Sequence, residues 1–163
     1  MPEDIDDEFA RRLREVTASV AGLDEEEALQ LLEIRLKQVQ INGQARHRLS
    51  LARARGTLAL ALGNRAEPDM IASLETMVST IEESGPPEAV SWDSQSVDPD
   101  SPAYDPELAA NQAELLECHH QNAVAILRLI AQISVSGDEP ELVATLERFL
   151  DHDLDAISEL EAR

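Results

Sequence analysis

The stretch DPELAANQAELLECHHQNAVAILRLIAQISVSG, residues 105–137, decides the fold. Its first residues, Asp105, Pro106 and Glu107, are a strong helix start, because an Asp side chain caps free backbone N–H groups and Pro fits the first helical turn. Its last residue, Gly137, is a typical helix stop. The stretch therefore predicts a long helix over residues 106–136.

A last helix is predicted directly after this stretch. Asp138 with Glu141 three residues later predicts a capped start, and Pro140 fits the first turn. Apolar residues then recur at helical spacing, which predicts one buried stripe. The stripe consists of Leu142, Leu146, Phe149, Leu150, Leu154, Ile157 and Leu160.

Further helices are predicted on the N-terminal side of residue 84. Residues 3–21 carry one apolar stripe. Residues 24–62 form either a single long helix with weak points at Gly43 and Gly56, which we favour, or two helices with a break near Asn42-Gly43. Pro68 begins another helix. The expected apolar faces are Leu29, Leu32, Leu36 and Val39 in the long helix, and Ile71, Leu74, Val78 and Ile81, widened by Met70 and Met77, in the next one.

Residues 84–105 form the longest predicted loop, because they contain four prolines and five serines and show no apolar periodicity. Trp92, the only Trp of the chain, lies in this loop. It either pins the loop onto the helices or serves as an exposed anchor for a partner. We favour pinning, because an aromatic side chain is usually buried when it can be.

These elements predict an all-α fold, a four- or five-helix antiparallel bundle with a long Pro/Ser-rich crossover loop. Aromatic residues make up only 2% of the chain, so its core must consist of aliphatic side chains, which suits packed helices. At 163 residues, the chain is expected to form one domain over residues 1–163.

Charge is strongly segregated along the chain. Residues 34–66 contain seven Lys or Arg and no acid, in a protein of net charge −20. In one interpretation these basic residues form ion pairs with acidic helices of the bundle or of a second copy. In the other, Arg46, Arg48, Arg53 and Arg55 form a basic patch for an acidic partner, a nucleotide or nucleic acid. The net negative charge argues against nucleic acid as a ligand, because the phosphates are repelled.

Glu117 and His120 are the sharpest chemical signal, because residues three apart share one face of a helix. Glu-x-x-His on bundle helices is the arrangement that di-iron carboxylate proteins use. The stripe Ala113, Leu116, His120, Ala123, Leu127 and Ile130 predicts that His120 points inward. A metal site would need helpers, for which His119, Glu33 and His152 are the candidates. The alternative, which we favour, is that His119 and His120 are structural or exposed.

The run His119-His120-Gln121-Asn122-Ala123-Val124 resembles the HHxxA(V/I) motif of small bacterial ferritin-like bundle proteins of unknown function. The resemblance covers about 45 C-terminal residues and extends to Asp138-Glu139-Pro140-Glu141-Leu142 and the final amphipathic helix. It implies a helical bundle that binds iron or another transition metal. Glu117-Cys118 stands where that family usually has a Met before the two histidines.

No Gly-rich phosphate loop, nucleophile elbow, CxxC pair or HExxH motif is present, so we favour a protein that is not an enzyme. No cofactor is expected, except iron or another transition metal in the ferritin-like alternative. The single Cys118 allows no intrachain disulfide, which fits the cytoplasm. The N-terminus does not resemble a secretory signal, and no apolar run is long enough to cross a membrane. We therefore expect a cytoplasmic interaction protein of the chaperone, antitoxin or adaptor kind. It would bind a basic protein partner or form a homo-oligomer.

Overall fold

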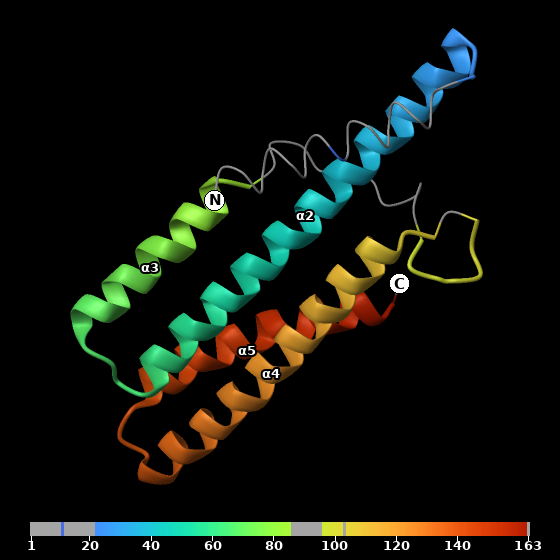
Figure 1. Ribbon diagram of the computed structural model, residues 1–163. Coiled ribbons are helices and arrows are strands. Elements are labelled where there is room, and N and C mark those ends of the chain that lie inside the picture. Colours follow the sequence, from blue (N-terminus) through green and yellow to red (C-terminus); the bar gives the residue numbers. More distant parts are fainter. Residues whose placement is uncertain (1–10, 12–21, 86–95, 103, 163) are drawn as a thin grey trace. The chain divides into compact units, whose positions relative to one another are not determined.

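The computed structural model describes residue 11 and residues 22–85, 96–102 and 104–162. This part of the chain is all-α, as predicted, and has no strand beyond an isolated bridge between Ser96 and Tyr104. The described helices are α2 (Glu25–Gly63), α3 (Pro68–Glu83), α4 (Pro106–Ser136) and α5 (Pro140–Glu161) (Figure 1). Apart from residue 11, the helix expected over residues 3–21 lies outside the described residues, as does Trp92.

Local sequence signals explain most of the helix ends. Asp24 and Glu27 cap the start of α2 reciprocally: the Glu27 N–H donates to Asp24 Oδ1 at 2.8 Å and the Asp24 N–H donates to Glu27 Oε2 at 3.3 Å. From there α2 continues as a single helix past both internal glycines, which confirms the long-helix prediction. Pro68 begins α3, and Gly137 ends α4 in the left-handed conformation with φ 70°.

The start of α5 differs from the prediction. Glu139, and not Asp138, occupies the capping position, and its side chain makes no capping hydrogen bond. The Glu139 carboxylate instead pairs with Arg65. An ion pair with a residue after α2 therefore replaces the expected local cap.

The chain divides into two compact units, Met1–Gln40 and Ile41–Arg163. In the first unit, Leu23 before α2 is exposed, and so are the apolar side chains Leu29, Leu32, Ile34, Leu36 and Val39 of α2. The second unit contains the rest of α2 together with α3, α4 and α5. The interpretation of residues 1–163 as one domain stays a prediction.

The core of the second unit is aliphatic. α4 and α5 are joined by residues 137–139 and lie side by side as an antiparallel pair (Figure 1). Ala59 of α2 packs into the main cluster that this pair forms, whose buried members include Ile126, Leu129, Ile133, Leu146, Leu150 and Ile157. On α3 the predicted face is confirmed, because Val78 is buried against Ala54 and Leu58 of α2. Met70 and Met77 do not widen that face, because both are exposed.

Close approach of α2 to α4 depends on a small residue. A Cβ atom at Gly56 would overlap the side-chain amide of Asn122. That amide is held in place, because Asn122 Nδ2 donates to the carbonyl of Ala52 at 3.0 Å. Gly56 therefore makes room for a side chain that joins two helices, rather than marking a break in α2.

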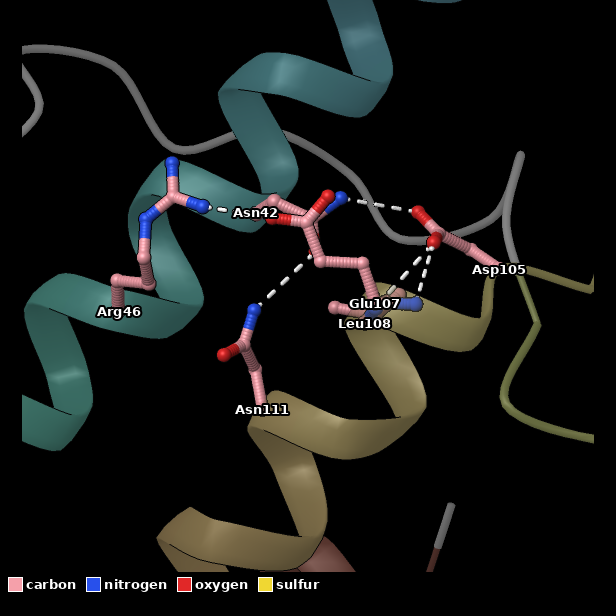
Figure 2. Close-up of polar contacts among 6 residues, drawn as sticks. All are labelled: Asn42, Arg46, Asp105, Glu107, Leu108 and Asn111. Carbon is pink, nitrogen blue, oxygen red and sulfur yellow. Dashed lines mark hydrogen bonds and ion pairs between the residues drawn. The ribbon is translucent and has the colours of Figure 1, made fainter. Parts of the chain in front are cut away.

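A polar cluster joins the start of α4 to α2 (Figure 2). Asp105 accepts from the N–H groups of Glu107 and Leu108 at 3.0 and 3.3 Å, which confirms its predicted role as the cap of α4. Its other carboxylate oxygen accepts from Asn42 Nδ2 at 3.0 Å. Asp105 and Asn42 are both buried, so their mutual hydrogen bond satisfies groups that water cannot reach.

Candidate functional site

The two histidines of α4 point in different directions. His119 is buried, whereas His120 is exposed and lies 3.6 Å from Glu161 Oε1. The prediction that His120 points inward is therefore wrong. The buried residues of α4 are Leu108, Gln112, Leu115, His119, Ala123, Ile126, Leu129 and Ile133, a stripe rotated by about one residue from the predicted one. Residue 119 continues the spacing of Leu115 and Ile126, and residue 120 does not.

His119 forms a buried pair with Asp153 of α5. His119 Nδ1 donates to Asp153 Oδ1 at 2.7 Å, and the two side chains are only 7% and 8% exposed. This bond fixes the imidazole ring and assigns the Nδ1 proton, so Nε2 is the nitrogen left for other contacts. Asp153 occupies the α5 face on which Leu154 was expected, and Leu154 is exposed. The structure therefore adds Asp153 as a site residue that the stripe on α5 did not reveal.

Arg55 and His152 form a second polar contact beside this pair. Arg55 Nη1 donates to His152 Nε2 at 2.9 Å, and Arg55 Nη2 donates to Glu82 Oε1 at 2.8 Å. A guanidinium can only donate, so His152 accepts through an unprotonated Nε2 and carries its proton on Nδ1. Partial burial, and then the Arg55 charge, lower the pKa of His152 below its usual value, which favours this neutral form.

The imidazole rings of His119 and His152 lie near each other at the edge of a cavity. Their centroids are 6.4 Å apart and their planes meet at 65°. The cavity has a volume of about 240 Å³ and lies between α2, α4 and α5. Its polar lining consists of Arg48, Arg55, His119, His152 and Glu159. Its apolar lining consists of Leu51, Ala52, Leu115, Ala156 and Leu160.

Of the residues predicted as metal ligands in the second unit, His119 and His152 lie near each other, whereas Glu117 and His120 are exposed. Glu117 is exposed and accepts from Gln121 Nε2 at 2.9 Å on its own helix. Glu33, in the first unit, pairs with Lys37 at 3.5 Å. Within the described ranges, no group of three or more His, Cys, Asp or Glu side chains is placed to hold a metal ion. Metal binding through Glu117 and His120 stays a prediction that the geometry does not favour.

Cys118, next to these histidines, is half-buried and free. Burial raises the pKa of its thiol, an effect that the charge of Arg53 partly opposes. A thiol with a raised pKa is mostly protonated at neutral pH and is a poor nucleophile. Cys118 therefore has the environment of a structural cysteine.

The four arginines of the predicted basic patch are directed at different partners. Arg46 pairs with Glu107 at 2.7 Å, Arg53 with Glu114 at 3.6 Å, and Arg55 with Glu82 at 2.8 Å. Arg48 lines the cavity. The partner acids lie on α3 and α4, so at least three of these arginines form the ion pairs that the first interpretation of the basic segment expects.

Sequence reasoning missed the buried polar residues Asp153 and Asn42, and also Gln44 and Gln112. Asn42 was interpreted only as part of a weak point before Gly43, yet it is the buried partner of Asp105. The available signal for Asp153 was its spacing from Leu146, Leu150 and Ile157, the other buried residues of α5.

Comparisons with protein-family models, with curated proteins and with solved structures found no match for this chain. The resemblance of its C-terminal part to ferritin-like bundle proteins therefore stays a prediction.

Proposed function

We propose that this chain is a non-enzymatic, cytoplasmic interaction protein whose acidic helix faces bind a basic protein partner. The proposal rests on a difference between the basic and the acidic side chains: the first are mostly paired within the second unit, and the second are mostly exposed. Arginines of the basic segment are paired with acids of other helices inside the second unit. Among the described residues, every Asp and Glu is exposed except Asp105, Glu139 and Asp153. The surface that a partner meets is therefore mainly acidic.

The acidic charge is densest on α5. This helix, PELVATLERFLDHDLDAISELE, carries acids at seven positions and a single Arg. Its charges attract a basic protein over a distance of about one Debye length, or about 8 Å at physiological ionic strength. Electrostatic steering of this kind raises the association rate more than it raises the final affinity.

An exposed apolar stripe on α4 supplies the contact area that charge alone lacks. Val124 and Leu127 are about half exposed, and Val135 is 89% exposed. His120 continues this stripe, and its contact with Glu161 links the stripe to the acidic end of α5. Apolar side chains beside a polar rim are the usual composition of a protein interface. Self-association through the same stripe is the second candidate, although a second copy carries the same net charge and is repelled.

The structure fits these two candidates better than a membrane protein. Within the described residues, no helix combines the length and the apolar character that a membrane span requires. The free Cys118 agrees with the cytoplasmic location that we propose.

The test is a binding measurement on a variant without the α5 charge. Partners are captured on the immobilised chain, and association rates of the purified partner are measured between 50 and 500 mM salt, a range of several-fold in Debye length. The test variant is Glu147→Gln, Asp151→Asn, Asp155→Asn on α5. The matched control is Asp69→Asn, Glu75→Gln, Glu83→Gln on α3, which removes the same charge elsewhere.

The α5 variant is expected to associate about tenfold more slowly at low salt, with a difference that disappears at high salt, whereas the α3 variant stays close to the native chain. An association rate that does not depend on salt would overturn the proposal. Equal effects of the two triple variants would also do so, because the α5 face would then have no special role. Light scattering of the chain alone distinguishes self-association.

A further inference from the structure

We propose that the cavity between α2, α4 and α5 binds a small organic carboxylate, a monoanion with an apolar body. This inference does not depend on the proposed partner, although α5 contributes Glu159 to the lining of the cavity. It starts from the juxtaposition of Arg48, Arg55, His119 and His152 around one cavity in a protein of net charge −20.

The cavity is built from regular helical positions. Arg48 and Arg55 are seven residues apart on α2, which places them on one face, two turns apart. His119 faces the cavity from α4 and His152 from α5. Sites on helices hold their side chains more precisely than sites on loops. The basic groups therefore converge as a consequence of the helix packing.

Two of these groups are held in position before any ligand binds. Glu82 and His152 fix two nitrogens of the Arg55 guanidinium, at 2.8 and 2.9 Å. A guanidinium has five N–H donors, so donors remain for a ligand. Asp153 fixes the ring of His119 through Nδ1. Asp153 thereby uses the Nδ1 proton of His119, so the fixed donor that faces a ligand is the Arg55 guanidinium, which loses little conformational entropy on binding an anion.

The lining indicates a carboxylate rather than a phosphate. Guanidinium N–H groups donate well to a carboxylate, in the planar arrangement that its two oxygens match. Glu159 brings a negative charge to the same cavity, which disfavours a dianion more than a monoanion. The remaining walls, which include Leu51, Leu115 and Leu160, suit an apolar body. The volume of about 240 Å³ lies just below the usual range of ligand pockets and limits the ligand to a small molecule.

The test titrates the full chain with hexanoate, inorganic phosphate and 1-hexanol in separate experiments, following the imidazole signals of the histidines by NMR. Hexanoate is expected to shift the signals of His119 and His152 saturably. Phosphate lacks the apolar body and 1-hexanol lacks the charge. Each is therefore expected to bind at least about tenfold more weakly than hexanoate. No saturable shift with hexanoate would overturn the proposal, as would equal binding of phosphate or of hexanol.

Matched variants decide whether the binding uses this cavity. Arg55→Gln is expected to lower the affinity for hexanoate at least about tenfold, because a hydrogen bond to a charged group is lost. The control Arg53→Gln, two residues away and paired with Glu114, is expected to stay within about twofold of the native chain. The second pair is His119→Gln against His120→Gln. Since His119 is buried and its variant can fail to fold, Arg55→Gln decides the outcome. Unchanged affinity in folded Arg55→Gln overturns the proposal.

Discussion

The two parts of α2 are one continuous helix, yet they differ completely in burial. In residues 25–40, Leu29, Leu32, Leu36 and Val39 recur at helical spacing and are 43–60% exposed. In residues 41–63, Ile41, Ala45, Leu49 and Ala52 recur at the same kind of spacing and are 0–6% exposed. An apolar stripe therefore predicts a helix but does not determine whether that helix is buried.

The residue types of the two parts explain the difference. The apolar face of residues 25–40 consists of large side chains such as Leu29 and Leu36. The buried face of residues 41–63 contains small residues, among them Ala52, Gly56 and Ala59. Small residues let another helix approach closely, as α4 does where Asn122 meets Gly56. The second part of α2 is therefore suited to lie between neighbouring helices.

The largest expected effect contrasts an Ile and a Leu five residues apart on α2. Ile41→Ala empties a fully buried position next to Ala45 and Leu108, and is expected to lower the free energy of unfolding by about 2–5 kcal/mol. Leu36→Ala changes an exposed side chain and is expected to cost about 0.5 kcal/mol or less. Urea denaturation followed by circular dichroism measures both. Equal costs would mean that the two parts of α2 are not distinguished by burial.

The next effect contrasts the two side-chain helix caps. Asp105→Ala removes the cap of α4 and also the hydrogen bond from the buried amide of Asn42, for a combined cost of about 2–4 kcal/mol. Asp24→Ala removes an exposed cap from α2, at a cost of about 0.5–1 kcal/mol. Thermal unfolding of both variants tests the difference. If Asp24→Ala were the more costly variant, the buried pair would contribute nothing.

A smaller effect compares two glycines of α2. Gly56→Ala forces the Asn122 amide to move, and is expected to destabilise the chain by about 1–3 kcal/mol. A Cβ atom at Gly43 meets nothing within 4 Å, so Gly43→Ala is expected to stabilise the helix by about 0.5–1 kcal/mol. Opposite shifts of the urea midpoint confirm that only Gly56 lies at a close helix contact, and shifts of the same sign contradict it.

The smallest expected effect is a dependence of folding stability on pH, and it arises from His152 in the second unit. The pKa of His152 is lowered in the folded chain by partial burial and by Arg55, against the opposing charges of Asp153 and Asp155. The unfolded chain therefore takes up a proton first as the pH falls through about 6.5. Stability should be full above that pH and decline below it.

Urea midpoints at pH 7.5 and 5.5 measure this decline in the native chain, in His152→Gln and in His120→Gln. His152→Gln is expected to reduce the decline, whereas His120→Gln, which keeps His152 in place, should retain it. An undiminished decline in His152→Gln would assign the dependence to other groups.

The helices themselves could be predicted largely from the sequence. Asp24 with Glu27, Pro68, Asp105 and Gly137 mark ends that the structure confirms. The candidate site could be predicted only in part. His119 and His152 were named, but as helpers of His120, because two overlapping apolar stripes on α4 differ by about one residue, or about 100° around the helix. Asp153 was missed because a buried acid interrupts an otherwise apolar stripe.

The sequence by itself determined the all-α class, most of the helix ends and the segregation of charge. These depend on capping groups, prolines and glycines that act within a few residues of the chain. Only the tertiary structure decided that His119 meets Asp153, that Arg55 meets both His152 and Glu82, and that Asn42 meets Asp105. These pairs join residues 27–97 positions apart, so their formation depends on how the helices pack.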